Sequence, residues 1–408
     1  MSNRQGVWSL ASHFQAIGDT NWLMPPGVPT SVTATGGNTN ASVAFSAPSF
    51  AGVPGTITAF KVTSSEGETA TGSSSPITVT SLTNGTAYTF TVQAQNSTGF
   101  GGSSSASSSI SPALGRGIFA GGRQGSVREN TIDYVSIAST GNATDFGDLT
   151  VGRQLSSQLM SSSTRGVFAG GLAASVTFVD TIDYITIAST GDATDFGNLT
   201  VGRYNAGGCS NDTRACILGG EQQGGTDNTI DYVTIASTGN ATDFGNLTEE
   251  VTIKGGCASP TRGLSFGGQE SNVIDYITIG STGNATDFGD LTQGGYGVSG
   301  AGSNSRACMA GRYYDDEFNI IDYVTIASTG NATDFGDLTA ALQGPMGTSN
   351  KTRAVYGGGD VGGSNRNQID YITIASTGNA QDFGDLTVTG SGGRRNGAAA
   401  GDSHGGIA

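Results

Sequence analysis

Residues 182–200 read Ile-Asp-Tyr-Ile-Thr-Ile-Ala-Ser-Thr-Gly-Asp-Ala-Thr-Asp-Phe-Gly-Asn-Leu-Thr, and five near copies of this stretch lie elsewhere in the 408-residue chain. The six copies begin at Ile132, Ile182, Ile230, Ile274, Ile321 and Ile369, with steps of 50, 48, 44, 47 and 48 residues. A period in this range predicts a repeat architecture, in which each copy is one supersecondary unit that stacks on its neighbours.

One period contains four short segments with strand character. In the second copy they are a small, polar segment at 157–163, an apolar run at 165–171, an alternating segment at 181–187 and a short run at 195–199. Alternating β-branched and aromatic residues favour strands, and the Ser-Thr-Gly-Asp at 189–192 favours a turn. Four strands in one period match one blade of a β-propeller, so the six copies predict six blades.

Five copies carry a glycine pair after the apolar run, at Gly121-Gly122, Gly170-Gly171, Gly219-Gly220, Gly267-Gly268 and Gly358-Gly359; the fifth copy has Gly311-Arg312 instead. We interpret the pairs as strand ends that bend sharply or admit another backbone. A tyrosine and a later phenylalanine, such as Tyr184 and Phe196, stand where kelch repeats place Tyr and Trp. Residues 116–403 therefore resemble kelch repeats, in a divergent form without the tryptophan. The Thr-Asp-Phe-Gly-Asp run also resembles part of the sialidase Asp-box.

Every copy also carries one arginine before the glycine position and one aspartate after the first isoleucine. The arginines are Arg116, Arg165, Arg214, Arg262, Arg306 and Arg353, and the aspartates are Asp133, Asp183, Asp231, Asp275, Asp322 and Asp370. Because a guanidinium matches a carboxylate in a bidentate pair, we expect one structural Arg–Asp ion pair in each blade. A ring of arginines that binds an anion is the alternative.

The composition restricts the class of protein. The chain has 67 glycines, few charged residues and a net charge of -15, which suits turn-rich β structure. No basic stripe is available for phosphates, so nucleic acid is not an expected partner. Neither a transmembrane segment nor a signal peptide is recognisable, so membrane insertion and secretion by that route are not expected.

Catalytic and metal-binding residues are not expected. The only histidines are His13 and His404, and no Ser/His/Asp or Cys/His set can be assembled from the repeats. Cysteines occur at positions 209, 216, 257 and 308, where they read as buried small side chains and not as a disulfide or zinc framework. The repeated carboxylates favour turns and caps, with calcium in the Asn/Asp loops as a minor alternative. No cofactor is predicted.

Residues 1–24 differ from the rest, since both tryptophans of the chain lie here. Leu10, Ala11, Phe14 and Ile17 would share one face of a short amphipathic helix. We expect the segment to dock onto a partner through Trp8, Phe14 and Trp22, because aromatic residues dominate interfaces. A terminus that folds back onto its own domain is the alternative.

Residues 25–112 predict a β-sandwich. The stretch 82–94 resembles the E–F corner and F strand of fibronectin type III domains, with Tyr88 as the corner tyrosine and Phe45 at a position that usually holds Trp. The Ser/Ala run at 103–109 predicts a flexible linker to the repeats. The expected fold is therefore all-β: a docking segment at 1–24, a fibronectin type III-like sandwich at 25–112 and a six-bladed, kelch-like propeller at 113–408.

This order of parts, with the opening Arg-Gln-Gly-Val-Trp at 4–8, resembles virion proteins of marine bacteriophages, including cyanophages. The resemblance implies a non-enzymatic tail fibre or surface appendage on the particle, present in several copies or as a homo-oligomer. Other virion proteins would bind residues 1–24, and a host glycan or protein would bind the propeller. A carbohydrate-active propeller enzyme and a head-decoration protein are the alternatives.

Host recognition is expected from the loops that vary most among the copies: Arg123–Asn130, Leu172–Asp180, Glu221–Asn228, Gln269–Asn272, Arg312–Asn319 and Asp360–Gln368. The fifth of these carries the expected recognition loop, which consists of Arg312, Tyr313, Tyr314, Asp315, Asp316, Glu317 and Phe318. At the C-terminus, residues 392–402 resemble the first strand of a blade. We expect them to pair with Gly117–Gly121 and to close the ring.

Overall fold

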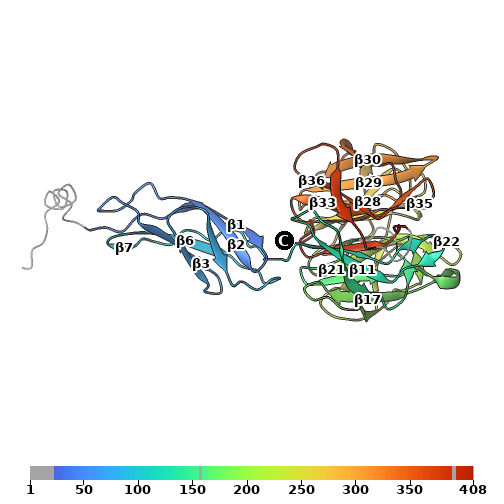
Figure 1. Ribbon diagram of the computed structural model, residues 1–408, viewed down its shortest axis with the longest axis horizontal. Coiled ribbons are helices and arrows are strands. Elements are labelled where there is room, and N and C mark those ends of the chain that lie inside the picture. Colours follow the sequence, from blue (N-terminus) through green and yellow to red (C-terminus); the bar gives the residue numbers. More distant parts are fainter. Residues whose placement is uncertain (1–22, 156–158, 388–391, 408) are drawn as a thin grey trace, which may run out of the picture. The chain divides into compact units, whose positions relative to one another are not determined.

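The computed structural model describes residues 23–155, 159–387 and 392–407. The chain divides into two compact units, Met1–Ala113 and Leu114–Ala408, and each is described by itself. Strands dominate both units (Figure 1), and the helix η1 (Ala174–Val176) is a single 3-10 turn. In the described residues no helix has the length and hydrophobicity needed to cross a bilayer.

The first unit is a sandwich of two antiparallel sheets. One sheet has the order β1 (Thr30–Gly37), β2 (Asn40–Ser46), β5 (Ile77–Thr80), and the other has the order β4 (Thr69–Gly72), β3 (Ala59–Ser64), β6 (Phe90–Asn96), β7 (Gly99–Phe100). Buried and half-exposed residues alternate along β2, β3 and β6 because one face of each strand packs into the core. In that core the rings of Phe45 and Phe60 lie 4.8 Å apart.

Tyr88 is the corner residue that the sequence predicted. Its side chain is buried, and its hydroxyl accepts a hydrogen bond of 3.0 Å from the backbone N–H of Thr83.

The Ser/Ala run at 103–109, however, is not a flexible linker. Ser104 and Ser107 are buried and donate backbone hydrogen bonds to Val92 and Phe90, at 2.9 Å each, so this run lies along β6 as part of the sandwich.

The second unit contains six antiparallel sheets of the same order, one for each copy of the repeat. From the innermost strand outward, sheet A consists of β38 (Ala398–Gly401), β8 (Arg116–Ala120), β11 (Thr131–Ser136) and β12 (Thr144–Asp148), and sheet B of β14 (Arg165–Ala169), β17 (Thr181–Thr186) and β18 (Thr194–Asn198). Sheet C consists of β20 (Gly207–Ser210), β21 (Arg214–Gln222), β22 (Gly225–Thr234) and β23 (Thr242–Asn246), and sheet D of β24 (Gly255–Ala258), β25 (Arg262–Phe266), β26 (Val273–Thr278) and β27 (Thr286–Asp290). Sheet E consists of β28 (Ser299–Gly302), β29 (Arg306–Tyr314), β30 (Asp316–Thr325) and β31 (Thr333–Asp337), and sheet F of β32 (Met346–Ser349), β33 (Arg353–Gly357), β36 (Gln368–Thr373) and β37 (Gln381–Asp385).

Short strands accompany these sheets in the connections: β9 (Arg123–Gln124), β10 (Val127–Arg128), β13 (Arg153–Gln154), β15 (Leu172–Ala173), β16 (Thr177–Phe178), β19 (Arg203–Tyr204), β34 (Asp360–Val361) and β35 (Ser364–Asn365). In sheet B the innermost position is occupied by an isolated bridge between Ser161 and Gly166.

The third strand of each sheet breaks the alternation that the sequence predicted. A β-bulge falls between the isoleucine and the aspartate of every copy, for example between Ile182 and Asp183. Such a bulge turns two successive side chains toward the same face. Both Ile182 and Asp183 are therefore fully buried.

Hydrophobic cores lie between neighbouring sheets. Six clusters of buried residues join A to B, B to C, C to D, D to E, E to F, and F back to A. The innermost strands also contact one another, and glycine permits the close approach: a Cβ on Gly256 would lie 2.4 Å from the carbonyl oxygen of Gly208.

The C-terminal strand β38 belongs to sheet A, although the other strands of that sheet begin the unit. Ala398 lies opposite Ala120 and Gly401 opposite Gly117, so the predicted pairing of residues 392–402 with the strand at 117–121 is present. This pairing covers the inner edge of β8, which would otherwise expose unpaired backbone groups.

Candidate functional site

The variable loops connect the second strand of each sheet to the third, so they lie at the same end of their sheets. Neighbouring loops are hydrogen-bonded to each other. The carboxylate of Glu317 accepts bonds of 2.8 and 2.9 Å from the N–H of Gly362, and the Asn365 amide donates to the carbonyl of Arg123 at 2.9 Å. The loops of sheets E, F and A thus meet at this end of the sheets, although they are far apart in the sequence.

The loop of sheet E is the hairpin between β29 and β30. Asp315, at the tip, has a φ of 59°, a left-handed conformation that aspartate tolerates better than most residues. Tyr314 is exposed, Phe318 is half-buried, and the ring of Tyr313 lies 5.1 Å from that of Tyr296. A paired aromatic surface beside carboxylates provides both apolar and hydrogen-bonding groups.

Arg312 does not belong to this surface, and its assignment to the recognition loop is wrong. Its side chain is fully buried, forms an ion pair of 2.9 Å with Asp322 and donates to the carbonyl of Gln293 at 2.7 Å. It stands at the second position of the glycine pair, on the side of β29 that faces the sheet core. The predicted recognition loop is therefore reduced to residues 313–318.

The expected ion pairs between the repeat arginines and aspartates are also wrong. In sheet B, Arg165 lies opposite Thr186, whereas Asp183 lies opposite Phe168, so the two residues are three pairs apart along the strands. Equal offsets in all copies showed that both residues are part of the framework. They did not show that the two contact each other.

Each repeat arginine instead joins its own sheet to the next one. The guanidinium of Arg165 lies 4.6 Å from the ring centroid of Tyr184, and its Nη1 donates to the carbonyl of Ile235 in sheet C at 3.0 Å. The same two contacts recur for the other five, with carbonyl acceptors Ile187 for Arg116, Ile279 for Arg214, Ile326 for Arg262, Ile374 for Arg306 and Ile137 for Arg353. The sixth acceptor lies in sheet A, so the contacts form a cycle.

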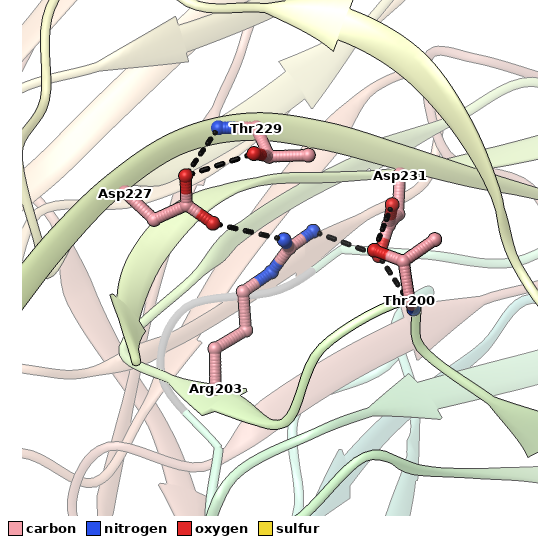
Figure 2. Close-up of polar contacts among 5 residues, drawn as sticks. All are labelled: Thr200, Arg203, Asp227, Thr229 and Asp231. Carbon is pink, nitrogen blue, oxygen red and sulfur yellow. Dashed lines mark hydrogen bonds and ion pairs between the residues drawn. The ribbon is translucent and has the colours of Figure 1, made fainter. Parts of the chain in front are cut away.

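The repeat aspartates are buried acceptors. Figure 2 shows Asp231, which accepts bonds from the N–H and hydroxyl of Thr200 in the preceding copy, at 3.1 and 2.8 Å. Arg203 lies between two carboxylates, 3.1 Å from Asp231 and 3.4 Å from Asp227, and Asp227 also accepts bonds from Thr229. The threonine contact recurs in every copy, and Thr387 completes the cycle by donating to Asp133.

In three of the six copies, an arginine from the connection that precedes the sheet pairs with the repeat aspartate. Arg153 binds Asp183 at 3.1 Å, and Arg394 binds Asp133 at 2.7 Å. Sequence reasoning missed these arginines, although the Val-Gly-Arg after Leu-Thr at 151–153 and 201–203 was available as a signal. The connection before sheet E contains no cation, so Arg312 supplies it from within the sheet.

In the two remaining copies, those of sheets D and F, no arginine forms an ion pair with the repeat aspartate among the described residues. In sheet D, Lys254 is buried and binds Glu249 at 3.1 Å. In sheet F, the amide of Gln368 donates to Asp370 at 3.0 Å. Burial raises the pKa of both Asp275 and Asp370, while hydrogen bonds from their threonines oppose the shift. Burial also lowers the pKa of Lys254.

The glycine pairs have the structural role that the sequence predicted. Both glycines of the second copy have positive φ values, 62° and 121°, and a Cβ on Gly170 would lie 2.4 Å from the carbonyl of Arg203. The pairs end the second strand and let the next connection approach. They leave no space for a ligand.

His404 lies among the innermost strands, away from the variable loops. It is fully buried, its Nδ1 accepts a bond of 3.0 Å from Gly406 N–H, and its Nε2 lies 3.1 Å from the carbonyl of Ser161. Burial lowers the pKa of His404 to about 4.

All four cysteines are free and buried, as predicted. Among the described residues, no three His, Cys, Asp or Glu side chains are placed to hold a metal ion. His13 and the docking residues Trp8, Phe14 and Trp22 lie outside the described residues.

Comparisons with known proteins identify one part of the chain. Residues 26–110 match the fibronectin type III domain family, in agreement with the sandwich and its corner tyrosine. The predicted fibronectin type III domain is therefore confirmed. A search of curated proteins returned no significant match to the chain.

Proposed function

We propose that the second unit is a six-bladed, kelch-like β-propeller, and that the protein is a non-enzymatic component of a bacteriophage particle. In this proposal it is a tail fibre or surface appendage, present in several copies. Residues 1–24 bind other virion proteins, and the propeller adheres to a glycan or protein on the host surface. The proposal rests in part on the resemblance of the sequence to virion proteins of marine phages.

The cyclic contacts support the propeller. Both the arginine–carbonyl bonds and the threonine–aspartate bonds run from each copy to the next and return from the sixth copy to the first. The six hydrophobic cores follow the same order. A flat row of sheets would leave its first and last members without these partners.

One observation carries the adhesive role. The framework residues repeat in every copy, whereas the loops that meet at one end of the sheets differ in length and composition. Variation confined to loops on a rigid scaffold is typical of recognition surfaces. The loop of sheet E presents Tyr313, Tyr314 and Phe318, and tyrosine is among the residues that contribute most to binding energy at interfaces.

The experiment compares labelled protein variants on a panel of bacterial cells that includes marine cyanobacteria. Replacing Tyr313, Tyr314 and Phe318 together by alanine should weaken binding at least tenfold without lowering the melting temperature of the second unit by more than a few degrees. The matched control replaces the exposed Phe50 and Phe100 of the first unit, which should leave binding unchanged. Equal binding by the loop variant and the control would contradict the proposal.

Assembly is tested separately. Deleting residues 1–24 should yield a folded protein that no longer enters phage particles, because the proposed docking residues are removed and both described units remain. Incorporation at the level of the full chain would show that another segment makes the contact.

A further inference from the structure

A hollow lies at the other end of the sheets, where the third strand turns into the fourth. In sheet C it has a volume of about 190 Å³ and is lined by Tyr232, Thr234, Ser237, Thr238 and Thr242, among others. In sheet F an equivalent hollow of about 240 Å³ is lined by the corresponding residues, including Tyr371, Ser376 and Thr377. These volumes lie below the roughly 300 Å³ at which drug-sized pockets begin, so each hollow suits a small group.

Part of this turn is explained by the framework. In sheet C the N–H groups of Gly239 and Ala241 donate to carbonyls of β18 in sheet B, at 2.8 Å each, and Asn240 accepts from the N–H of Asn198 at 3.1 Å. These three residues hold neighbouring sheets together. Their presence in nearly every copy follows from that contact.

The hydroxyls of the turn have no such explanation. Ser237, Thr238 and Thr242 are exposed, and within the described residues their side chains make no hydrogen bond to the chain. The Ser-Thr pair nevertheless occurs in all six copies, and the threonine in five. The turn explains a preference for serine and threonine at these positions. Their hydroxyls, however, are exposed and unbonded, which leaves them available to a ligand.

The sixth copy shows what these hydroxyls flank. There Gln381 replaces the threonine, and its side-chain oxygen accepts a hydrogen bond of 2.6 Å from the hydroxyl of Tyr371. In sheet C the shorter Thr242 leaves the hydroxyl of Tyr232 without a partner among the described residues. Five copies thus pair a tyrosine with a threonine across the third and fourth strands. In the sixth copy the hollow is open, but its tyrosine hydroxyl is already bonded to glutamine.

The chemistry of the lining selects the ligand. Hydroxyl and amide groups can both donate and accept hydrogen bonds, which matches the hydroxyls of a sugar. The repeat arginine of sheet C, Arg214, is already bound to the ring of Tyr232 and to a backbone carbonyl. An exposed aspartate follows each threonine on the fourth strand, as Asp243 follows Thr242. A negatively charged ligand would be repelled by these carboxylates in a chain of net charge -15.

We propose that the hollow of sheet C, and the equivalent turn of the four other threonine-containing copies, binds one residue of a neutral oligosaccharide, through the hydroxyls of the tyrosine, the threonine and the Ser-Thr turn. Each site alone is weak. Several equivalent sites on one chain make binding to a polysaccharide much tighter through high effective concentration. The sites lie at the opposite end of the sheets from the variable loops, so this inference does not depend on the proposed host-recognition surface.

The test measures retention of the full-length protein on immobilised mannan, dextran and galactan, with alginate as the acidic polysaccharide. We expect retention on at least one neutral polysaccharide, competition by its free monosaccharide at millimolar concentrations, and no retention on alginate. Lack of retention on all three neutral polysaccharides, or retention on alginate alone, would overturn the proposal.

The decisive variant copies the sixth repeat into the others, by replacing Thr144, Thr194, Thr242, Thr286 and Thr333 with glutamine. The chain already accommodates glutamine at this position, so the variant should fold with an unchanged melting temperature and lose at least tenfold in affinity for the retained polysaccharide. The matched control places glutamine at the exposed Ala138, Ala188, Ala236, Ala327 and Ala375, outside the hollow, and should bind normally. Unchanged affinity of the threonine variant would refute the sites. Replacement of Tyr313, Tyr314 and Phe318 should not affect this binding, which separates the result from the test of the variable loops.

Discussion

Arg353 donates a hydrogen bond from Nη1 to the carbonyl oxygen of Ile137 at 3.0 Å, across 216 residues of the chain. Its guanidinium also lies 4.4 Å from the ring centroid of Tyr371. The equivalent Arg165 makes the same two contacts between consecutive copies, at 3.0 Å to Ile235 and 4.6 Å to Tyr184. The join between the last and first copies is therefore built like the joins within the series.

This equivalence predicts equal effects of equal substitutions. Replacing Arg353 with methionine should lower the free energy of unfolding by about 1–3 kcal/mol, because a charged hydrogen bond and a cation–π contact are lost. The same change at Arg165 should cost the same within about 0.5 kcal/mol. Urea unfolding of both variants gives the comparison. A much smaller loss at Arg353 would show that the sixth and first copies are only loosely joined in solution.

Removing the C-terminal strand should be far more damaging than shortening the N-terminus. Truncation after Thr389 removes Arg394 and β38, leaves Asp133 buried without its cation and exposes the inner edge of β8. Loss of one partner from a buried ion pair alone costs about 3–5 kcal/mol. Thermal unfolding should show a large drop in melting temperature for this truncation, and almost none when residues 1–19 are removed. Equal melting of the C-terminal truncation and the full chain would disprove closure by β38.

Restoring the glycine pair of the fifth copy should destabilise the protein. A comparison of the six copies suggests Arg312→Gly as a harmless consensus change, but the structure shows that Arg312 supplies the cation for the buried Asp322. We expect a loss of about 3–5 kcal/mol in the free energy of unfolding. Adding Asp322→Asn to this variant should recover part of the loss, because no buried charge then remains unpaired. A double-mutant cycle by urea unfolding measures the coupling.

Two buried groups near the C-terminus should make stability depend on pH in opposite directions. The folded pKa of His404, about 4, lies below its usual 6.5, so the unfolded state binds the proton more readily, and this contribution to stability is lost as the pH falls from 6.5 to 4. Burial raises the pKa of Asp402 from 3.8 to about 6, although its carboxylate accepts bonds from the N–H groups of Gly115 and Arg116. Its charge therefore destabilises the folded state as the pH rises from 3.8 to 6.

Single variants separate the two contributions. Each pKa shift changes the free energy of unfolding by about 3 kcal/mol once the pH has passed through both the folded and the unfolded pKa. In the wild type the two changes largely cancel between pH 4 and 6. In Asp402→Asn the histidine contribution is no longer offset by Asp402, so stability should rise with pH in this window more steeply than in the wild type. In His404→Asn it should fall with pH instead. Chemical unfolding at half-unit intervals of pH provides the measurement, and parallel profiles for the two variants would contradict the assignment.

The second copy carries Asp192 where the other copies have asparagine. Its carboxylate accepts a bond of 3.0 Å from the N–H of Asp148, and burial followed by the charge of Asp192 raises the pKa of Asp148. Asp192→Asn keeps the acceptor and removes the repulsion, so it should stabilise the protein at pH 7 by a few tenths of a kcal/mol. The gain should vanish near pH 3. Asn331 accepts the equivalent bond of 3.1 Å from the N–H of Asp290, so Asn331→Asp should have the opposite sign at pH 7, as followed by melting temperature.

The first unit was predictable from local signals. The alternation of buried residues in its strands and the spacing around Tyr88 are properties of short segments, and they hold in the structure. The Ser/Ala run at 103–109 was misjudged because its composition is that of a linker. Its order comes from backbone bonds to β6, and composition does not reveal such long-range pairing.

The repeats of the second unit determined, by sequence alone, that there are six sheets, that they share one strand order and that the final strand belongs with the first sheet. A fixed period requires equivalent local structures, and a strand left over at one end must find the edge left open at the other. Sequence also marked Arg165, Asp183 and their equivalents as framework residues.

Only the tertiary structure decided which partners these residues have. Each arginine reaches the next sheet, and each aspartate meets a threonine from the preceding copy. In four copies an arginine also pairs with the aspartate, from a connection in three of them and from the sheet itself at Arg312. Such choices depend on the register of paired strands, the bulge after each isoleucine and the distance between neighbouring sheets. A constant offset in the sequence is compatible with several of these arrangements, because a side chain three residues along a strand lies about 10 Å away and contacts a different neighbour.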